Sequence, residues 1–150
     1  MSDSSRLQPH TDACVDGYAA VCGTQWFHGT WTDEEHQLAR DDSMSRDSMP
    51  WKELFAIVAA ASTWGSRWTR KRVVFFTDCM PVVQALTKGA SRTRRIMQLI
   101  RVLHFQAARY HFVYRAEHIA GIDNTLADEL SRVFDVSPVI SCSVRSNQIT

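Results

Sequence analysis

Residues 73–79, with the sequence VVFFTDC, place four consecutive apolar side chains directly before Thr77 and the acid Asp78. A short run that is apolar on both faces is typical of a strand in the middle of a sheet that helices cover. We therefore expect an α/β fold in which residues 73–76 form a central strand and Asp78 lies at its end.

The sequence before this strand predicts three more strands. Residues 6–13 form the first, although Pro9 is better suited to a sheet edge or a strand start. Residues 18–22 and 25–31 form the other two, because Gly23-Thr24 between them indicates a hairpin turn.

A polar segment and a helix follow these strands. Residues 33–48 mix Asp, Ser and Arg and predict a long loop. A helix is expected to begin near Pro50, with Ser48 as its cap. Its buried face repeats at helical spacing through Trp51, Leu54, Phe55, Val58 and Ala61. Trp64 and Trp68 continue this stripe, so core packing is favoured over stacking on nucleic acid.

Two helices, a strand and a last helix are predicted after residue 79. They cover residues 81–86, ending at Gly89, then 93–109, 110–115 and 124–133, with Asn124 as the last helix cap. The order predicts a mixed five-stranded sheet, with three antiparallel strands first and βα units after them, flanked by helices. We expect one domain over residues 7–133, with flexible tails at 1–6 and 134–150.

Composition excludes several classes of protein. The chain has 150 residues, 45% of them hydrophobic, and a formal net charge of +1, as expected for one soluble domain. Its four cysteines form no C-x-x-C pair, so neither a zinc site nor a disulfide framework is expected. A reducing compartment inside the cell, nucleus or cytoplasm, fits this usage. The longest apolar stretch, 54–61, is far too short to span a membrane.

Basic residues gather in one part of the chain. Between residues 66 and 101 the only acid is Asp78, and the basic residues are Arg67, Arg70, Lys71, Arg72, Lys88, Arg92, Arg94, Arg95 and Arg101. This asymmetry suggests a basic face for an anionic partner, and a solvated helix surface is the alternative.

Four acids stand at the edges of predicted elements: Asp12, Glu53, Asp78 and Asp128. Each has a structural explanation, because an acid can cap a helix, complement its dipole or end a strand beside a turn. The case for function rests on their joint arrangement. Right-handed crossover connections allow the strand ends at Asp12 and Asp78 to lie side by side.

The ordered set of acids resembles the type 1 ribonuclease H domain of reverse-transcribing elements. The matching phrases are TDACVDGYAAV at 11–21, WKELFAI at 51–57, VVFFTDC at 73–79 and EHIAGIDNTLADELSR at 117–132. GTQWFHGTW at 23–31 and SMPWKELFA at 48–56 are most similar to the reverse transcriptase/ribonuclease H of DIRS-like retrotransposons. Cys14 departs from the family, which usually has Ser at this position.

The resemblance implies a ribonuclease H-like fold and hydrolysis of the RNA strand of an RNA–DNA hybrid. It implies two Mg²⁺ ions, for which Mn²⁺ can substitute, with Asp12 and Asp78 as central ligands and Glu53 and Asp128 flanking them. His118 would assist proton transfer or product release from a mobile loop. The reverse transcriptase domain of the same element is a possible partner.

Substrate contacts and the charge of the site follow from the same hypothesis. The residues expected to grip phosphates beside the cleft are Lys88, Arg92, Arg94 and Arg95. Asn124 would contact the substrate backbone, unless it only caps a helix. Four clustered acids repel one another without metal, so at least one carboxyl group should have a raised pKa.

Two other functions remain open at this point. One is a catalytically silent, retroelement-derived module that binds nucleic acid or protein. The presence of all four acids argues against simple decay. The other is a different nuclease of the same broad fold, such as an integrase or resolvase, which the His118-to-Asn124 loop fits poorly.

Overall fold

The computed structural model describes residues 6–40, 48–124 and 127. Its strands are β1 (Arg6–Leu7), β2 (His10–Ala13), β3 (Gly17–Cys22), β4 (Gln25–Thr30), β5 (Arg72–Thr77) and β6 (Val113–His118). Its α-helices are α1 (Asp33–Arg40), α2 (Met49–Trp64), α3 (Met80–Lys88) and α4 (Arg94–Tyr110). Two short 3₁₀ helices, η1 (Gly65–Arg67) and η2 (Gly121–Asp123), complete the described elements.

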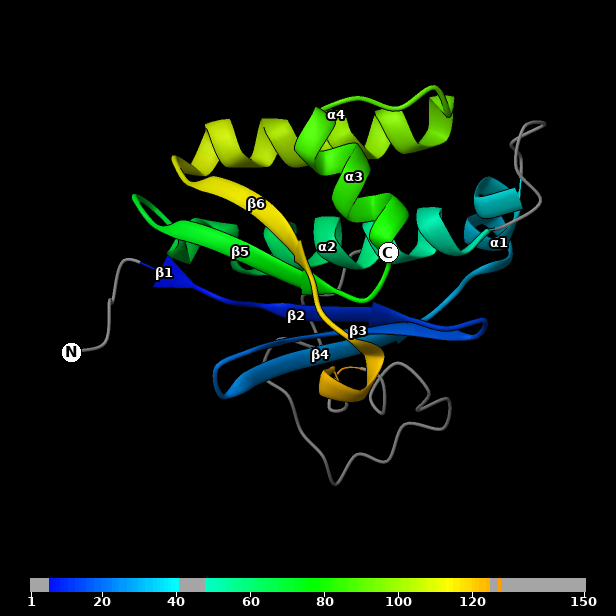
Figure 1. The fold of residues 1–150 in the computed structure, drawn as a ribbon, viewed down its shortest axis with the longest axis horizontal. Helices are drawn as coiled ribbons and strands as arrows, with labels where there is room; N and C mark the ends of the chain where they lie inside the picture. Colours follow the sequence, from blue (N-terminus) through cyan, green and yellow to red (C-terminus); the bar gives the residue numbers. More distant parts are fainter. Residues whose placement is uncertain (1–5, 41–47, 125–126, 128–150) are drawn as a thin grey trace.

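The strands form one mixed sheet, which confirms the predicted α/β class (Figure 1). Its order is β1-β5-β2-β3-β4, and β6 pairs with β5 as well. β5 is parallel to β1, β2 and β6, whereas β2, β3 and β4 form an antiparallel meander. The strand over 73–76 is therefore central, as predicted from its apolar run.

Pro9 explains why the sheet has six strands rather than the five predicted. The expected strand over 6–13 is interrupted at Gln8 and Pro9, which separates β1 from β2. Proline has no backbone N–H for a ladder hydrogen bond. Its carbonyl oxygen still accepts a 2.9 Å hydrogen bond from the backbone N–H of Phe76, so both pieces stay beside β5.

The predicted hairpin at Gly23-Thr24 is confirmed. β3 pairs with β4 from Gly17 opposite Thr30 to Cys22 opposite Gln25, which leaves a two-residue turn. Gly23 has a φ of +62°, a conformation that two-residue hairpin turns require and that glycine adopts without steric cost.

The prediction of a loop over 33–48 is wrong for residues 33–40, which form α1. Thr32 and Glu35 make a capping box: Thr32 Oγ1 accepts from the Glu35 N–H at 3.1 Å, and Glu35 Oε1 accepts from the Thr32 N–H at 2.8 Å. Three acids in the first turn also complement the helix dipole. The sequence T-D-E-E at 32–35 contains this capping box, which indicates a helix start. The polar composition of 33–48 favoured a loop instead.

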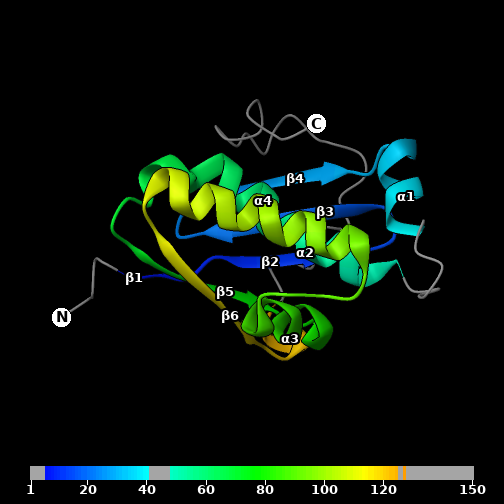
Figure 2. The same ribbon diagram turned by 90° about the horizontal axis from the view of Figure 1, so that it is seen from above.

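The buried core contains side chains of the sheet and of α2, α3 and α4. Figure 2 shows α4 lying over α2. α2 packs on β2 and β3, and α4 lies along α2 on the side away from the sheet. Gly65, at the end of α2, allows this close approach, since a Cβ there would lie 2.7 Å from the Tyr110 ring. Trp64 and Trp68 are each 2% exposed, which confirms that they pack in the core. No helix within the described ranges is long and apolar enough to cross a bilayer.

Some predicted boundaries need correction. Ser48 makes no side-chain cap bond to α2, and its backbone is already helical, although Pro50 does lie in the first turn. α3 ends before Gly89, as predicted, with glycine in the left-handed conformation at a φ of +73°. The strand expected over 110–115 is β6, which begins at Val113 because α4 continues to Tyr110. The predicted last helix lies outside the described residues apart from Asn124 and Ala127.

Candidate active site

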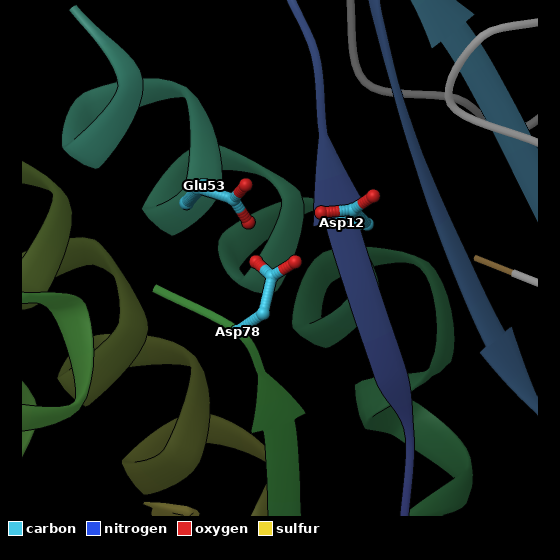
Figure 3. A group of neighbouring side chains, drawn as sticks. All are labelled: Asp12, Glu53 and Asp78. Atoms are coloured by element: carbon cyan, nitrogen blue, oxygen red, sulfur yellow. The ribbon is translucent and has the colours of Figure 1, made fainter. Parts of the chain in front are cut away.

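Three predicted acids come together where α2 begins and where β2 and β5 end (Figure 3). Asp12 lies on β2, Glu53 is the fifth residue of α2, and Asp78 directly follows β5. One carboxylate oxygen from each lies within 4.8 Å of the other two. Because hard cations such as Mg²⁺ prefer oxygen ligands, this donor set fits a divalent ion of that kind.

Glu53 is fixed by hydrogen bonds from both neighbouring strands. Its Oε1 accepts from the backbone N–H of Ala13 at 3.3 Å, and its Oε2 accepts from Thr77 Oγ1 at 3.5 Å. Thr77 Oγ1 in turn accepts from the backbone N–H of Cys79 at 3.2 Å. Ala13 follows Asp12 in the chain and Thr77 precedes Asp78. The two hydrogen bonds therefore set the distance of Glu53 from both aspartates.

The burial and closeness of the three carboxyl groups affect their protonation. Asp12 and Glu53 are only 2% and 4% exposed, whereas Asp78 is half-buried and opens the cluster to solvent. Burial, followed by the negative charges of Asp12 and Asp78, raises the pKa of Glu53 to about 10. The expected raised pKa in the cluster is therefore present, and Glu53 holds its proton at neutral pH when no cation is bound.

Asp78 has a close neighbour that the sequence analysis did not single out. A Cβ at Gly121 of η2 would lie 3.3 Å from Asp78 Oδ2. Any side chain larger than that of glycine would make a tight contact with this carboxylate oxygen, which would have to move. Gly121 stands between β6 and the predicted last helix, and nothing in its sequence context distinguished it from an ordinary loop glycine.

A buried lysine holds the turn that follows Asp12. Lys52 is 3% exposed, and its Nζ donates to the carbonyl oxygen of Val15 at 3.0 Å and lies 3.1 Å from His36 Nδ1. Burial and then the charge of Arg40 lower the pKa of Lys52. Val15 is 66% exposed, so this bond fixes the backbone of a turn whose side chain at Val15 faces solvent.

The sequence predicts His118 on a mobile loop, but in the structure His118 is the last residue of β6. It pairs in register with Thr77, and the next backbone N–H, that of Ile119, donates to the Thr77 carbonyl at 2.9 Å. The side chain of His118 is exposed at the same end of the sheet as Asp78. Its strand position gives it a fixed backbone, and its predicted part in catalysis stays a prediction.

Asn124 faces the protein interior. It is 2% exposed, and its Nδ2 donates to the carbonyl oxygen of Thr11 at 2.9 Å. This bond attaches the segment after η2 to β2, one residue before Asp12. The bond supports a role for Asn124 in holding the backbone, and its predicted contact with substrate stays a prediction. Asp128, the fourth predicted acid, lies outside the described residues.

The predicted phosphate-binding residues lie around the start of α4. Lys88 ends α3, Arg92 lies in the following loop, and Arg94 and Arg95 form the first turn of α4. The first three are exposed. Arg95 lines a hollow of about 170 Å³ that Pro50 and Trp51 of α2 also line. Arg95 is therefore close to the end of α2 that carries Glu53.

Comparisons with known proteins agree with this fold. No family model matches the sequence, and no curated protein sequence matches it either. Among solved structures, ribonuclease H1 of Halobacterium salinarum superimposes with a TM-score of 0.60 and 14% identity, over 84% of this chain and 94% of that one. The N-terminal ribonuclease H domain of a Mycobacterium tuberculosis protein gives 0.59 and 15%, over 85% and 91%.

A third similar structure is LC11-RNase H1 in complex with an RNA/DNA hybrid. Its TM-score is 0.62 at 13% identity, and the match covers 83% of this chain and 93% of that chain. The chain has the ribonuclease H fold. The expected fold class is confirmed, and the three carboxylates lie at the end of the sheet where β2 and β5 stop.

The pKa of Glu53 predicts how stability depends on pH. Between its ordinary value of 4.5 and about 10, the folded protein keeps a proton that the unfolded chain loses. The free energy of unfolding of the metal-free protein therefore falls as pH rises from 5 to 9. Glu53→Gln should flatten this slope in urea unfolding measured at several pH values. An identical slope in the variant would contradict the protonated state of Glu53.

Gly121→Ala tests the space beside Asp78. A methyl group 3.3 Å from Oδ2 displaces the carboxylate, so Mn²⁺ should bind about tenfold more weakly, in the range seen when groups next to metal ligands are changed. Isothermal titration calorimetry measures the affinity, and Ala120→Ser at the exposed neighbouring position is the control. Equal Mn²⁺ affinity in Gly121→Ala and the natural chain would refute this role.

Proposed function

We propose that the chain is a metal-dependent endonuclease that hydrolyses the RNA strand of RNA–DNA hybrids. The observation that carries the proposal is the convergence of Asp12, Glu53 and Asp78 within 4.8 Å on a ribonuclease H fold. The hybrid bound in one structure of similar fold supports the choice of substrate.

The donor set supports Mg²⁺ as the natural cofactor, with Mn²⁺ as a substitute, because both ions favour octahedral oxygen ligation. When bound, two such ions would supply Lewis-acid chemistry for hydrolysis of a phosphodiester. Asp12 and Asp78 would be the central ligands, with Glu53 and Asp128 on either side. Glu53 would release its proton when it becomes a ligand.

Other residues of the chain would position the substrate and move protons. Exposed His118 stands at the strand end next to Thr77 and would exchange a proton with the attacking water or the leaving group. Lys88, Arg92, Arg94 and Arg95 would contact phosphates, which fixes the position of the hybrid without reading its sequence. The hybrid displays 2′-hydroxyls in a shallow minor groove, which distinguishes it from duplex DNA.

The proposal extends to the origin of the chain. The phrases GTQWFHGTW and SMPWKELFA favour a DIRS-like retrotransposon, in which the domain would act with a reverse transcriptase of the same element. Its place of action would then be inside the cell, in the nucleus or cytoplasm.

Cleavage of a hybrid labelled on its RNA strand tests the function. The natural chain should cut the RNA in Mg²⁺ and not in EDTA, and Asp78→Asn should lower kcat by about 10³-fold, since a metal ion supplies several kcal/mol of transition-state stabilisation. Asp33→Asn, the same change at the start of α1, is the control. Folded natural protein that binds hybrid without cutting it would favour the catalytically silent module instead.

Duplex DNA and duplex RNA of the same sequence complete this experiment. Cleavage confined to the hybrid is the expected result. Equal cleavage of duplex DNA would favour a nuclease of the integrase or resolvase kind.

A further inference from the structure

Beyond its first turn, the outer face of α4 has no role in the proposed site or in the core. Its residues there, here called the outer stripe, are exposed: Gln98, Arg101, Val102, Phe105, Ala108 and Arg109. The opposite face of α4 packs inward through Ile96, Ile100 and Leu103. Figure 2 shows α4 lying over α2.

The outer stripe combines positive charge with exposed apolar surface. Phe105 is 63% exposed and Val102 is 42% exposed, so neither contributes much to folding. Arg101 and Arg109 stand four residues on either side of Phe105, which places all three on one ridge with about 5–6 Å between neighbouring Cβ atoms. The guanidinium of Arg109 lies 5.2 Å from the centre of the Tyr110 ring, which gives it a defined place at the end of the ridge.

The charge of α4 selects the kind of partner. Its sequence, RRIMQLIRVLHFQAARY, contains four arginines and no Asp or Glu, so no acid on the helix itself neutralises them. Such a one-sided charge favours a polyanion over another copy of the same positive face. An exposed aromatic ring between arginines is the arrangement that stacks on unpaired bases while cations contact the phosphates.

We infer that the outer stripe of α4 binds single-stranded nucleic acid, with Phe105 stacked on a base and Arg101 and Arg109 on flanking phosphates. The helix is about 25 Å long, enough to follow several nucleotides. It begins at Arg94 and Arg95, and Arg95 lines a hollow with Pro50 and Trp51, at the end of α2 that carries Glu53. A single strand that leaves the end of a hybrid would therefore continue along α4. Only this link between the hybrid and α4 rests on the proposed function.

Binding of fluorescein-labelled 15-nucleotide oligo(dT) to the full chain, followed by fluorescence anisotropy, tests the inference. Phe105→Ala should weaken binding about tenfold, and Phe105→Trp should restore it. Arg101→Glu with Arg109→Glu should weaken binding further and reduce the slope of log affinity against log salt by about 1.4, or about 0.7 for each lost phosphate contact. Arg101→Glu alone should reduce this slope by about 0.7, whereas Arg6→Glu, the same single charge change on β1, is the control and should have a small effect.

Several results would overturn the inference. One is the absence of binding by the folded natural chain, and another is an equal loss of affinity in Arg6→Glu and Arg101→Glu. The others are an unchanged affinity in Phe105→Ala and an equal affinity for duplex DNA of the same length. The last result would indicate a general phosphate-binding surface. Circular dichroism and urea unfolding establish that each variant is folded.

The two proposals can fail separately. On a blunt hybrid without single-stranded tails, the outer-stripe variants should cut at the natural rate, whereas on a hybrid with a 15-nucleotide tail they should show a KM raised about tenfold. If neither the natural chain nor the variants cleave the hybrid, but the natural chain still binds oligo(dT), the nuclease proposal is rejected. The proposal that the outer stripe binds single strands then stands. Normal cleavage with no effect of the tail would reject the link between them.

Discussion

Repulsion among three carboxyl groups is the constraint on which the rest of this structure depends. Asp12, Glu53 and Asp78 lie within 4.8 Å of one another, and two of them are almost fully buried. Burial, and then the negative charges of Asp12 and Asp78, raise the pKa of Glu53 to about 10, so Glu53 keeps its proton and three negative charges do not meet. The folded chain thus holds a group of oxygen ligands whose full charge appears only when a cation offsets it.

The fold supplies the rigidity that this arrangement needs. The hydrogen bonds from Ala13 and Thr77 join Glu53 to β2 and β5, and α2 is buried along most of its length against the sheet. Lys52 fixes the turn after Asp12, and Asn124 holds the segment after η2 against the same strand. Each carboxylate is therefore attached to an element that the core immobilises, as a site for a closely specified metal geometry requires.

The sequence predicted those parts of the fold that depend on local signals. The apolar run at 73–76, the glycine turn at Gly23 and the acids at strand and helix ends each have a short-range physical cause. The proximity of Asp12 and Asp78 was predicted from the right-handed crossover of parallel strands and from the family resemblance. What the sequence did not reveal depends on tertiary contacts, as in the burial of Asn124, the strand position of His118 and the space beside Gly121. The helix α1 is the exception, because its Thr32–Glu35 capping box was present and its polar composition was read as a loop.

The position of the metal ions tests the central claim most directly. Crystals of the chain with an uncut hybrid analogue and Mn²⁺, measured at the manganese absorption edge, should show two anomalous peaks about 3.5–4 Å apart. Both peaks should lie among the carboxylates of Asp12, Glu53 and Asp78. No peak among these carboxylates at saturating Mn²⁺, with hybrid bound elsewhere on the surface, would contradict the account.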